Sequence, residues 1–354
     1  MSSFEILSLE SRDNWNEHLK QLPVDQQDIY FTPEYYQLYE NNGEGNALCF
    51  VFEKNGDIAM YPFLLSSVNK LGYNLNKQYY DIQGAYGYNG VATSSNNRSF
   101  IDSFYKTFHD YVRDTRIIAE FTRFHPLLNN YKFSEGNLDI LFDRNTVFIE
   151  LNKNYEEIFK TFQTTTKKQI KRCHHKYNLE VEIIEIDTSQ IEVFYSIYTE
   201  AMARVQSIEY LYFNIEYFRK LISNTKSALF IATEEGKPIA AIIAFYTTNF
   251  IHGHLGGALT EYLNTSSYSL LYSEMIKFGI EKGCKYFHAG GGTTSNTDDK
   301  LLQFKLNFSD TKADFYIGKK IHNQLIYDEV IKQWETKFPE ATGQFNNRIL
   351  KYRF

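Results

Sequence analysis

Apolar and polar residues follow the same layout in two separate stretches of the chain. In the first, apolar arms at residues 47–53 and 58–61 flank Asn55-Gly56, a pair that readily adopts the positive φ angles of a type I′ turn. The second stretch starts at residue 228 as the first starts at residue 47, and its apolar arms at 228–234 and 239–242 flank a Glu-Gly-Lys-Pro turn. We therefore predict a β-hairpin in each stretch.

The layout around the two hairpins is also shared. Similar aromatic segments precede them at 31–36 and 213–218, and short apolar strands are predicted near 116–121 and 285–288. Between hairpin and strand, each copy has a helical pattern with an apolar residue every three or four positions. These positions are Ile101, Phe104, Tyr105, Phe108 and Val112 in the first copy, and Tyr268, Leu271, Tyr272, Met275, Ile276 and Gly279 in the second, where Ser266 or Ser267 is the predicted N-cap. Two generic hairpins that are alike by chance remain an alternative, but the repeated order predicts an α/β (α+β) fold with two units, each a mixed β-sheet flanked by helices.

Length and composition agree with this prediction. The chain has 354 residues, of which 43% are hydrophobic and 23% charged, so a disordered chain is excluded and two domains are expected. The net charge of -6 gives no general attraction to DNA. Three isolated cysteines, no apolar leader and no apolar run long enough to span a bilayer predict a cytoplasmic protein with no transmembrane segment.

Four segments carry a family resemblance: residues 80–90, 167–172, 202–213 and 299–308. The last resembles a Leu-x-x-Phe-Lys-x-x-Phe signature. With these segments the sequence resembles the Fem-type (FemABX-like) peptidyltransferases, relatives of the N-acyltransferases that carry tandem GNAT domains. The resemblance implies a first GNAT-like lobe at residues 1–150, completed by 311–354, and a second lobe at 151–310.

The resemblance also implies transfer of an acyl or aminoacyl group to an amine in the building of the cell envelope. We expect an acetyltransferase that moves an acyl group from acetyl-CoA or another acyl-CoA to a sugar-nucleotide or lipid-linked precursor, with no metal. One departure is that residues 263–265 lack the glycine-bearing GNAT cofactor loop. An aminoacyl-tRNA-dependent transferase that extends a peptidoglycan precursor peptide is therefore the first alternative. A non-catalytic module that binds a glycan or a peptide is the second.

Two residues are candidates for the chemistry. The resemblance points to Lys305 as the group that stabilises the oxyanion of the tetrahedral intermediate. The alternative is an ordinary exposed lysine on a short helix capped by Thr297 or Asp298. His252 and His254 are expected on one side of a strand, and His254 or the substrate itself is the candidate acceptor of the amine proton. A structural histidine at the end of a strand is the alternative.

Candidate binding residues fall into a donor group and an acceptor group. For the donor, Gly290, Gly291 and Gly292 would let backbone N–H groups approach a phosphate, and Ser267 opens the second helix. For the acceptor or a tRNA end, a basic helical face containing Lys168 and Arg172 would hold phosphate. The other expected acceptor contacts are Arg204, Tyr212, Phe304 and a first-lobe wall of Asp81, Tyr86 and Tyr88. A flexible turn, a solvated helix face and core tyrosines are the competing explanations.

Overall fold

The computed structural model describes residues 2–354, and the contacts within the chain divide it into two compact units. Unit 1 contains the residues up to Asp143 together with Phe315–Phe354, and unit 2 is Arg144–Asp314. These divisions lie a few residues from the predicted boundaries at 150 and 310, and the assignment of lobes stays a prediction. Within residues 2–354, no helix is both long and apolar enough to cross a membrane.

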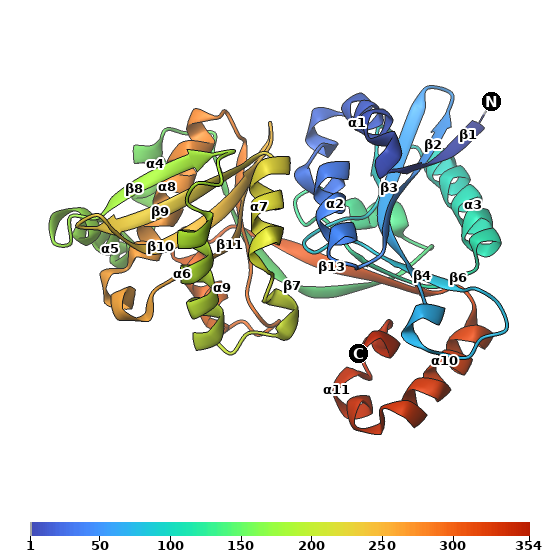
Figure 1. Cartoon of the computed structure of the whole chain (residues 1–354). Helices are drawn as coiled ribbons and strands as arrows, with labels where there is room; N and C mark the ends of the chain where they lie inside the picture. The colour runs from blue at the N-terminus through green and yellow to red at the C-terminus, as the bar shows by residue number, and fades with distance from the viewer. Residues whose placement is uncertain (1) are drawn as a thin grey trace. The chain divides into compact units, whose positions relative to one another are not determined.

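Unit 1 contains a mixed sheet with strands in the order β1-β2-β3-β4-β6-β13 (Figure 1). Neighbouring strands are antiparallel except β4 and β6, which are parallel, and β5 pairs with β3. The strands are β1 (Ser2–Ser8), β2 (Asn46–Lys54), β3 (Asp57–Ser67), β4 (Tyr80–Gln83), β5 (Ala92–Thr93), β6 (Ile117–Arg123) and β13 (Lys312–Ile321). The helices are α1 (Arg12–Gln21), α2 (Pro33–Asn41), α3 (Arg98–Thr115), α10 (Gln324–Lys337) and α11 (Thr342–Phe345).

Unit 2 contains a sheet with strands in the order β8-β9-β10-β11-β12-β7. Here β11 and β12 form the parallel pair, and the other neighbours are antiparallel. The strands are β7 (Asp139–Glu150), β8 (Glu180–Glu185), β9 (Ser227–Glu234), β10 (Lys237–Tyr246), β11 (Phe250–Ala258) and β12 (Tyr286–Gly291). The helices are α4 (Tyr155–Thr161), α5 (Thr164–His175), α6 (Ile191–Arg204), α7 (Ile215–Asn224), α8 (Ser267–Glu281) and α9 (Lys300–Leu306).

The two units repeat one order of elements. The order α2, β2, β3, β4, α3, β6 in unit 1 corresponds to α7, β9, β10, β11, α8, β12 in unit 2. Both predicted hairpin turns have positive φ angles, 56° and 88° at Asn55 and Gly56, and 51° and 79° at Glu235 and Gly236. The predicted α/β fold with a mixed sheet in each unit is confirmed.

One predicted helix cap is confirmed and another is wrong. Ser266 stands at the N-cap of α8, although its φ of 62° is left-handed and its side chain makes no capping hydrogen bond. At α9 the cap is Asp299, whose carboxylate accepts from the N–H groups of Leu301 and Leu302 at 3.0 Å. An aspartate at this position satisfies two N–H groups that the first turn of the helix leaves without partners.

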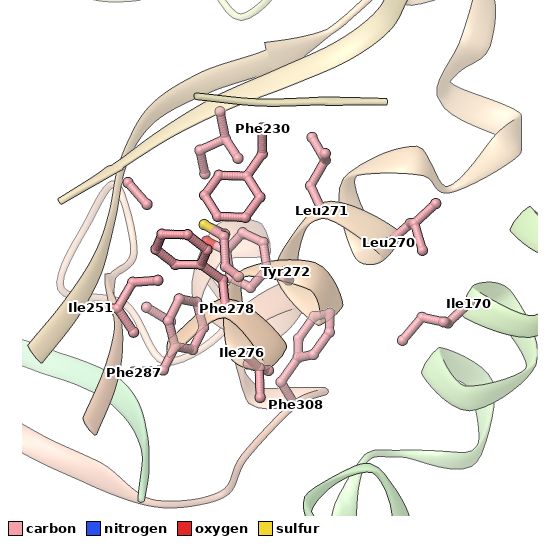
Figure 2. Packing of buried hydrophobic residues seen from close by; sticks show 14 of the residues in the cluster. Ile170, Phe230, Ile251, Leu270, Leu271, Tyr272, Ile276, Phe278, Phe287 and Phe308 are labelled. Carbon is pink, nitrogen blue, oxygen red and sulfur yellow. The ribbon is translucent and has the colours of Figure 1, made fainter. Parts of the chain in front are cut away.

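The core of unit 2 is built on α8. Figure 2 shows Tyr272, Ile276 and Phe278 on this helix near Phe230 of β9 and Phe287 of β12, and the Tyr272 and Phe287 rings lie 5.5 Å apart. The predicted apolar positions of α8 are buried, apart from Tyr268, which is half-buried, and each large side chain contributes about 1.5–3 kcal/mol on burial. On its other side, Tyr272 packs against Phe304 of α9 with ring centroids 5.1 Å apart. The core of unit 2 thereby fixes the helix that carries Lys305.

Candidate functional site

Lys305 is a buried lysine on α9. The residue is only 7% exposed, and its Nζ donates a hydrogen bond to the carbonyl of Gly291 at 2.6 Å. Burial lowers the pKa of Lys305 to about 7, the nearby Asp299 carboxylate works against this shift, and the positive charge of Arg144 adds to it. Near neutral pH this amine is therefore present both with and without its extra proton.

Asp299 holds the loop that leads into α9. Besides capping the helix, its carboxylate accepts from the backbone N–H groups of Thr293 and Thr294 at 3.0 Å, and from both threonine hydroxyls. Burial on its own would raise the pKa of Asp299, but the hydrogen bonds from Thr293, Leu302 and Thr294 hold it well below its ordinary range. The loop between β12 and α9 is thus organised around a carboxylate that stays ionised.

Arg144 is a site residue that the sequence analysis missed. Strand β7 pairs with β12, with Thr146 opposite Gly291, and this register brings Arg144 to the end of β12. Its guanidinium donates to the carbonyl of Gly292 at 2.9 Å. No sequence motif links Arg144 to residue 292, because only the pairing of strands distant in the sequence brings them together.

The glycines at the end of β12 have clear packing roles. Gly290 has a φ of 78° beside a break in the β7–β12 register, a conformation that favours glycine. A Cβ at Gly292 would lie 2.5 Å from Oδ1 of Asp299, and one at Gly291 would lie 3.1 Å from Cδ of Arg144. Close packing explains Gly291 and Gly292, so their predicted approach to a donor phosphate stays a prediction.

The basic helix α5 is present as predicted, and it lies against the start of α8. Lys168 is exposed, whereas the Arg172 guanidinium donates to the Asn264 carbonyl at 3.1 Å and to Ser266 Oγ at 3.2 Å. Cys173 Sγ contacts the Thr265 carbonyl at 3.2 Å, and Ser267 is only 1% exposed. Helix α5 thus contacts the segment where a GNAT cofactor loop was sought, in which Leu263 and Asn264 stay exposed. Ser267 itself is buried, and its contact with a cofactor stays a prediction.

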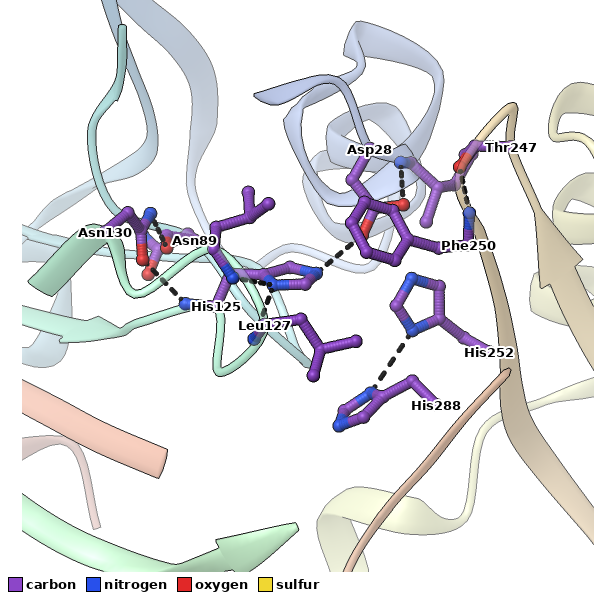
Figure 3. A network of polar contacts seen from close by, with 11 residues as sticks. Asp28, Asn89, His125, Leu127, Asn130, Thr247, Phe250, His252 and His288 are labelled. Atoms are coloured by element: carbon purple, nitrogen blue, oxygen red, sulfur yellow. Dashed lines mark hydrogen bonds and ion pairs between the residues drawn. The ribbon is translucent and has the colours of Figure 1, made fainter. Parts of the chain in front are cut away.

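The histidines of β11 differ from the expected pair. The β10–β11 register passes from Gly253 to Leu255, so His254 lies at a β-bulge and simple alternation with His252 does not apply. Burial lowers the pKa of His254 to about 3, with a smaller contribution from His252. Such a weakly basic imidazole is poorly suited to take the amine proton. His252 instead contacts His288 of the neighbouring strand through their Nδ1 atoms, 3.3 Å apart (Figure 3).

Arg204 and Phe304, two other predicted binding residues of unit 2, make their described contacts with residues other than Lys305. Arg204 donates to the Ala258 carbonyl at 2.7 Å and to Thr260 Oγ1 at 3.1 Å, which ties the end of α6 to the end of β11. Tyr212 is exposed in the segment between α6 and α7. Phe304 packs toward the core, against Tyr272. The structure therefore gives Arg204 and Phe304 structural contacts, and their roles toward substrate stay predictions.

The predicted wall in unit 1 is corrected at Asp81. This carboxylate is 1% exposed, pairs with Arg353, and accepts from the Tyr352 hydroxyl at 2.7 Å. It holds the end of the chain and is not open to a sugar. Tyr86 and Tyr88 are half-buried in the loop after β4, and the Tyr88 ring packs edge-on against Tyr30 at 5.2 Å.

Figure 3 also shows a buried hydrogen-bonded pair, His125 and Asp28, in unit 1. His125 Nε2 lies 2.7 Å from Oδ2 of Asp28, and both side chains have no exposed surface. The backbone N–H groups of Leu127 and Leu128 donate to the other ring nitrogen at 3.2 and 3.3 Å. These contacts fix the loop that follows β6.

Comparison with known proteins decides the family. The profile of the FemAB-like family, described as peptidoglycan biosynthesis or recognition, matches residues 86–297. The chain belongs to the FemAB-like family. The resemblance seen in the sequence is thereby confirmed.

Individual FemAB-like and GNAT-like proteins are similar to this chain over different lengths. A UDP-N-acetylmuramoylpentapeptide-lysine N(6)-alanyltransferase of Weissella viridescens is 27% identical over 177 residues, which are 48% of this chain. The aligned part spans about half (51%) of that curated relative. The crystal structure of FemX superposes with a TM-score of 0.70 at 10% identity, over 92% of this chain and 99% of FemX. A tandem GNAT protein from the clavulanic acid pathway superposes with a TM-score of 0.50 at 7% identity, over 90% and 98% of the two chains. These structures support a fold of two GNAT-like units.

The comparisons also correct one prediction. Acetyl transfer from acyl-CoA to a sugar-nucleotide or lipid-linked precursor is wrong as the main expectation. The curated relative is an alanyltransferase, and the matched family is one of peptidoglycan biosynthesis or recognition.

Proposed function

We propose that this FemAB-like chain transfers an aminoacyl group from an aminoacyl-tRNA to an amine on the peptide of a peptidoglycan precursor. Membership of the family and the similarity to an alanyltransferase support the reaction class. The observation that carries the proposal is the buried Lys305, whose Nζ is held by the Gly291 carbonyl beside Asp299 and Arg144.

The reaction needs stabilisation of the negative charge that develops on the carbonyl oxygen. The amine nitrogen attacks the ester carbonyl carbon, a C–N bond forms, and the carbonyl oxygen becomes an oxyanion. The C–O bond to the terminal ribose then breaks, and the ribose oxygen leaves with the proton that the amine gives up. In the proposal, the Lys305 ammonium donates a hydrogen bond to the oxyanion from a site shielded from water, where such a bond has its largest effect.

The pKa of Lys305 fits this role. An ordinary lysine is strongly hydrated and firmly protonated, whereas Lys305 has a pKa of about 7 because it is buried. Lys305 Nζ donates to the neutral carbonyl of Gly291. An oxyanion is a stronger acceptor and can replace this carbonyl. The neighbouring Asp299 keeps a share of Lys305 charged at neutral pH.

The proposal is tested by incubating the purified chain with radiolabelled aminoacyl-tRNA and a UDP-linked muramoyl pentapeptide, and following the label into the peptide. Lys305→Ala is expected to lower turnover about 100-fold or more. The matched control is Lys300→Ala, because Lys300 is exposed on the same helix. Absence of label transfer by the wild-type chain from every aminoacyl-tRNA tried, with lipid-linked precursor also supplied, would contradict the proposal.

A further inference from the structure

Helix α5 carries a concentration of positive charge that the proposed chemistry at Lys305 does not use. The chain as a whole has a net charge of -6, yet Thr164–His175 contains four Lys or Arg residues, two histidines and no acidic residue. The basic side chains of this helix are Lys167, Lys168, Lys171 and Arg172. His174, His175 and Lys176 extend the basic run, and all three are exposed.

The charge on this helix is available to a partner. Lys168 and Lys171 are exposed, and within residues 2–354 neither forms an ion pair with a carboxylate. By contrast, Lys282, which is also exposed in unit 2, pairs with Glu185 at 2.8 Å. Unneutralised charges along one face are the electrostatic pattern expected for binding a polyanion.

The orientation of the basic face is fixed by the opposite side of α5. Thr166, Ile170 and Cys173 are buried along one stripe, and Ile170 belongs to the core cluster of unit 2. Arg172 is held by the Asn264 carbonyl and by Ser266, as described above. These contacts prevent α5 from rotating about its own axis, so Lys168 and Lys171 stay on its exposed side.

This helix is also attached directly to α9. The backbone N–H of Gln163, at the N-cap of α5, donates to the carbonyl of Asn307, which caps the C-terminus of α9, at 2.9 Å. The rings of Phe162 and Phe308 pack beside this bond with centroids 5.2 Å apart. A ligand bound along α5 is thus held by an element joined to the helix of Lys305.

We propose that the exposed face of α5 containing Lys168 and Lys171 binds the phosphate backbone of the donor tRNA near its aminoacylated end. This inference rests on the proposed function. The exposed lysines of this run extend from Lys168 to Lys176, about 12 Å along the helix axis. A row of that length suits successive phosphates of one RNA strand, whereas the pyrophosphate of a nucleotide-linked or lipid-linked precursor would concentrate its charge at one end.

The test compares two double charge reversals in the full chain. Lys168→Glu with Lys171→Glu changes the proposed surface. The matched control is Lys220→Glu with Lys226→Glu, two exposed lysines elsewhere in unit 2. Unacylated tRNA is the binding probe, and its dissociation constant is measured across a range of salt concentrations. If the α5 double variant does not fold, as judged by its melting curve, Lys168→Gln with Lys171→Gln replaces it.

The α5 variant is expected to bind tRNA about tenfold or more weakly at low salt, with the slope of log affinity against log salt reduced by about 2. In the transfer assay its KM for aminoacyl-tRNA rises, while the KM for the precursor and kcat stay near the wild-type values. The control double variant is expected to match the wild type in every measurement.

Two results would overturn the inference without touching the proposed function: transfer with an unchanged KM for aminoacyl-tRNA, or a raised KM for the precursor alone. The second would assign the α5 face to the pyrophosphate of the acceptor. Conversely, tRNA binding that depends on α5, in a chain that transfers no aminoacyl group to any precursor, would support the inference and refute the proposed function.

Discussion

Replacing Lys305 by methionine separates the stability of the fold from the proposed chemistry. Methionine keeps most of the length and volume of the lysine side chain but carries no charge. Lys305 is buried, and its pKa of about 7 compares with an ordinary value of 10.5. Between these two values the unfolded chain binds more protons than the folded chain, so the stability of the wild type rises with pH across this window.

The size of this effect follows from the two pKa values. Between pH 7 and pH 9 the contribution of Lys305 to the free energy of unfolding rises by about 2 kcal/mol. The methionine variant lacks this titration. It is expected to be more stable than the wild type at pH 7, and its advantage is expected to shrink by about 2 kcal/mol at pH 9.

The assay is urea unfolding of both proteins at pH 7, 8 and 9, with aminoacyl transfer measured on the same preparations. All other titrating groups are shared, so their effects cancel in the difference between the two proteins. Lys300→Met is the control, and its difference from the wild type is expected to stay constant with pH. A constant difference for Lys305→Met would refute the reasoning, because Lys305 would then titrate as an ordinary exposed lysine. Turnover of Lys305→Met is expected to fall about 100-fold or more, in spite of its higher stability.

Three further predictions concern the fold. Asp81→Asn leaves the largely buried guanidinium of Arg353 without its counter-charge and is expected to cost about 3 kcal/mol in unfolding free energy. The control Asp102→Asn removes an exposed i,i+4 pair with Arg98 and is expected to cost about 0.5 kcal/mol or less. Equal losses in the two variants would contradict the structural role of Asp81. Gly279→Ala places a Cβ 2.7 Å from Cγ2 of Ile251 and should lower stability in urea unfolding by about 1–3 kcal/mol, a reading that an unchanged midpoint would exclude. Burial, with the nearby Lys320, lowers the pKa of His109 to about 4. The unfolded chain therefore binds the extra proton first, and the stability of the folded chain falls as the pH drops from 6.5 toward 4. His109→Gln should lose less stability than the wild type over that range, and parallel melting-temperature profiles of the two proteins would refute this.

The local parts of the fold were predictable from the sequence because they depend on neighbours along the chain. Asn55-Gly56 specifies its turn by the φ angles that it tolerates, and the spacing of Leu271, Met275 and Ile276 specifies the buried face of α8. The repeat of these signals was enough to predict two similar units.

The site was less predictable because its contacts join distant parts of the sequence. Lys305 was singled out through a family signature, but its burial comes from packing that periodicity does not reveal. Arg144 reaches Gly292 only through the pairing of β7 with β12. Arg172 was expected to face a phosphate, yet it faces the carbonyl of Asn264, because α5 docks at the start of α8. The bulge at His254 likewise required the register of β10 and β11.

The central claim is that this FemAB-like chain moves an aminoacyl group with the help of Lys305. It is tested most directly by mass spectrometry of a precursor pentapeptide after incubation with the chain and a mixture of all aminoacyl-tRNAs. The account predicts a product heavier by one amino-acid residue, formed at a comparable rate by Lys300→Ala and about 100-fold or more slowly by Lys305→Ala. A product formed equally fast by Lys305→Ala, or no product from the wild-type chain, would contradict it.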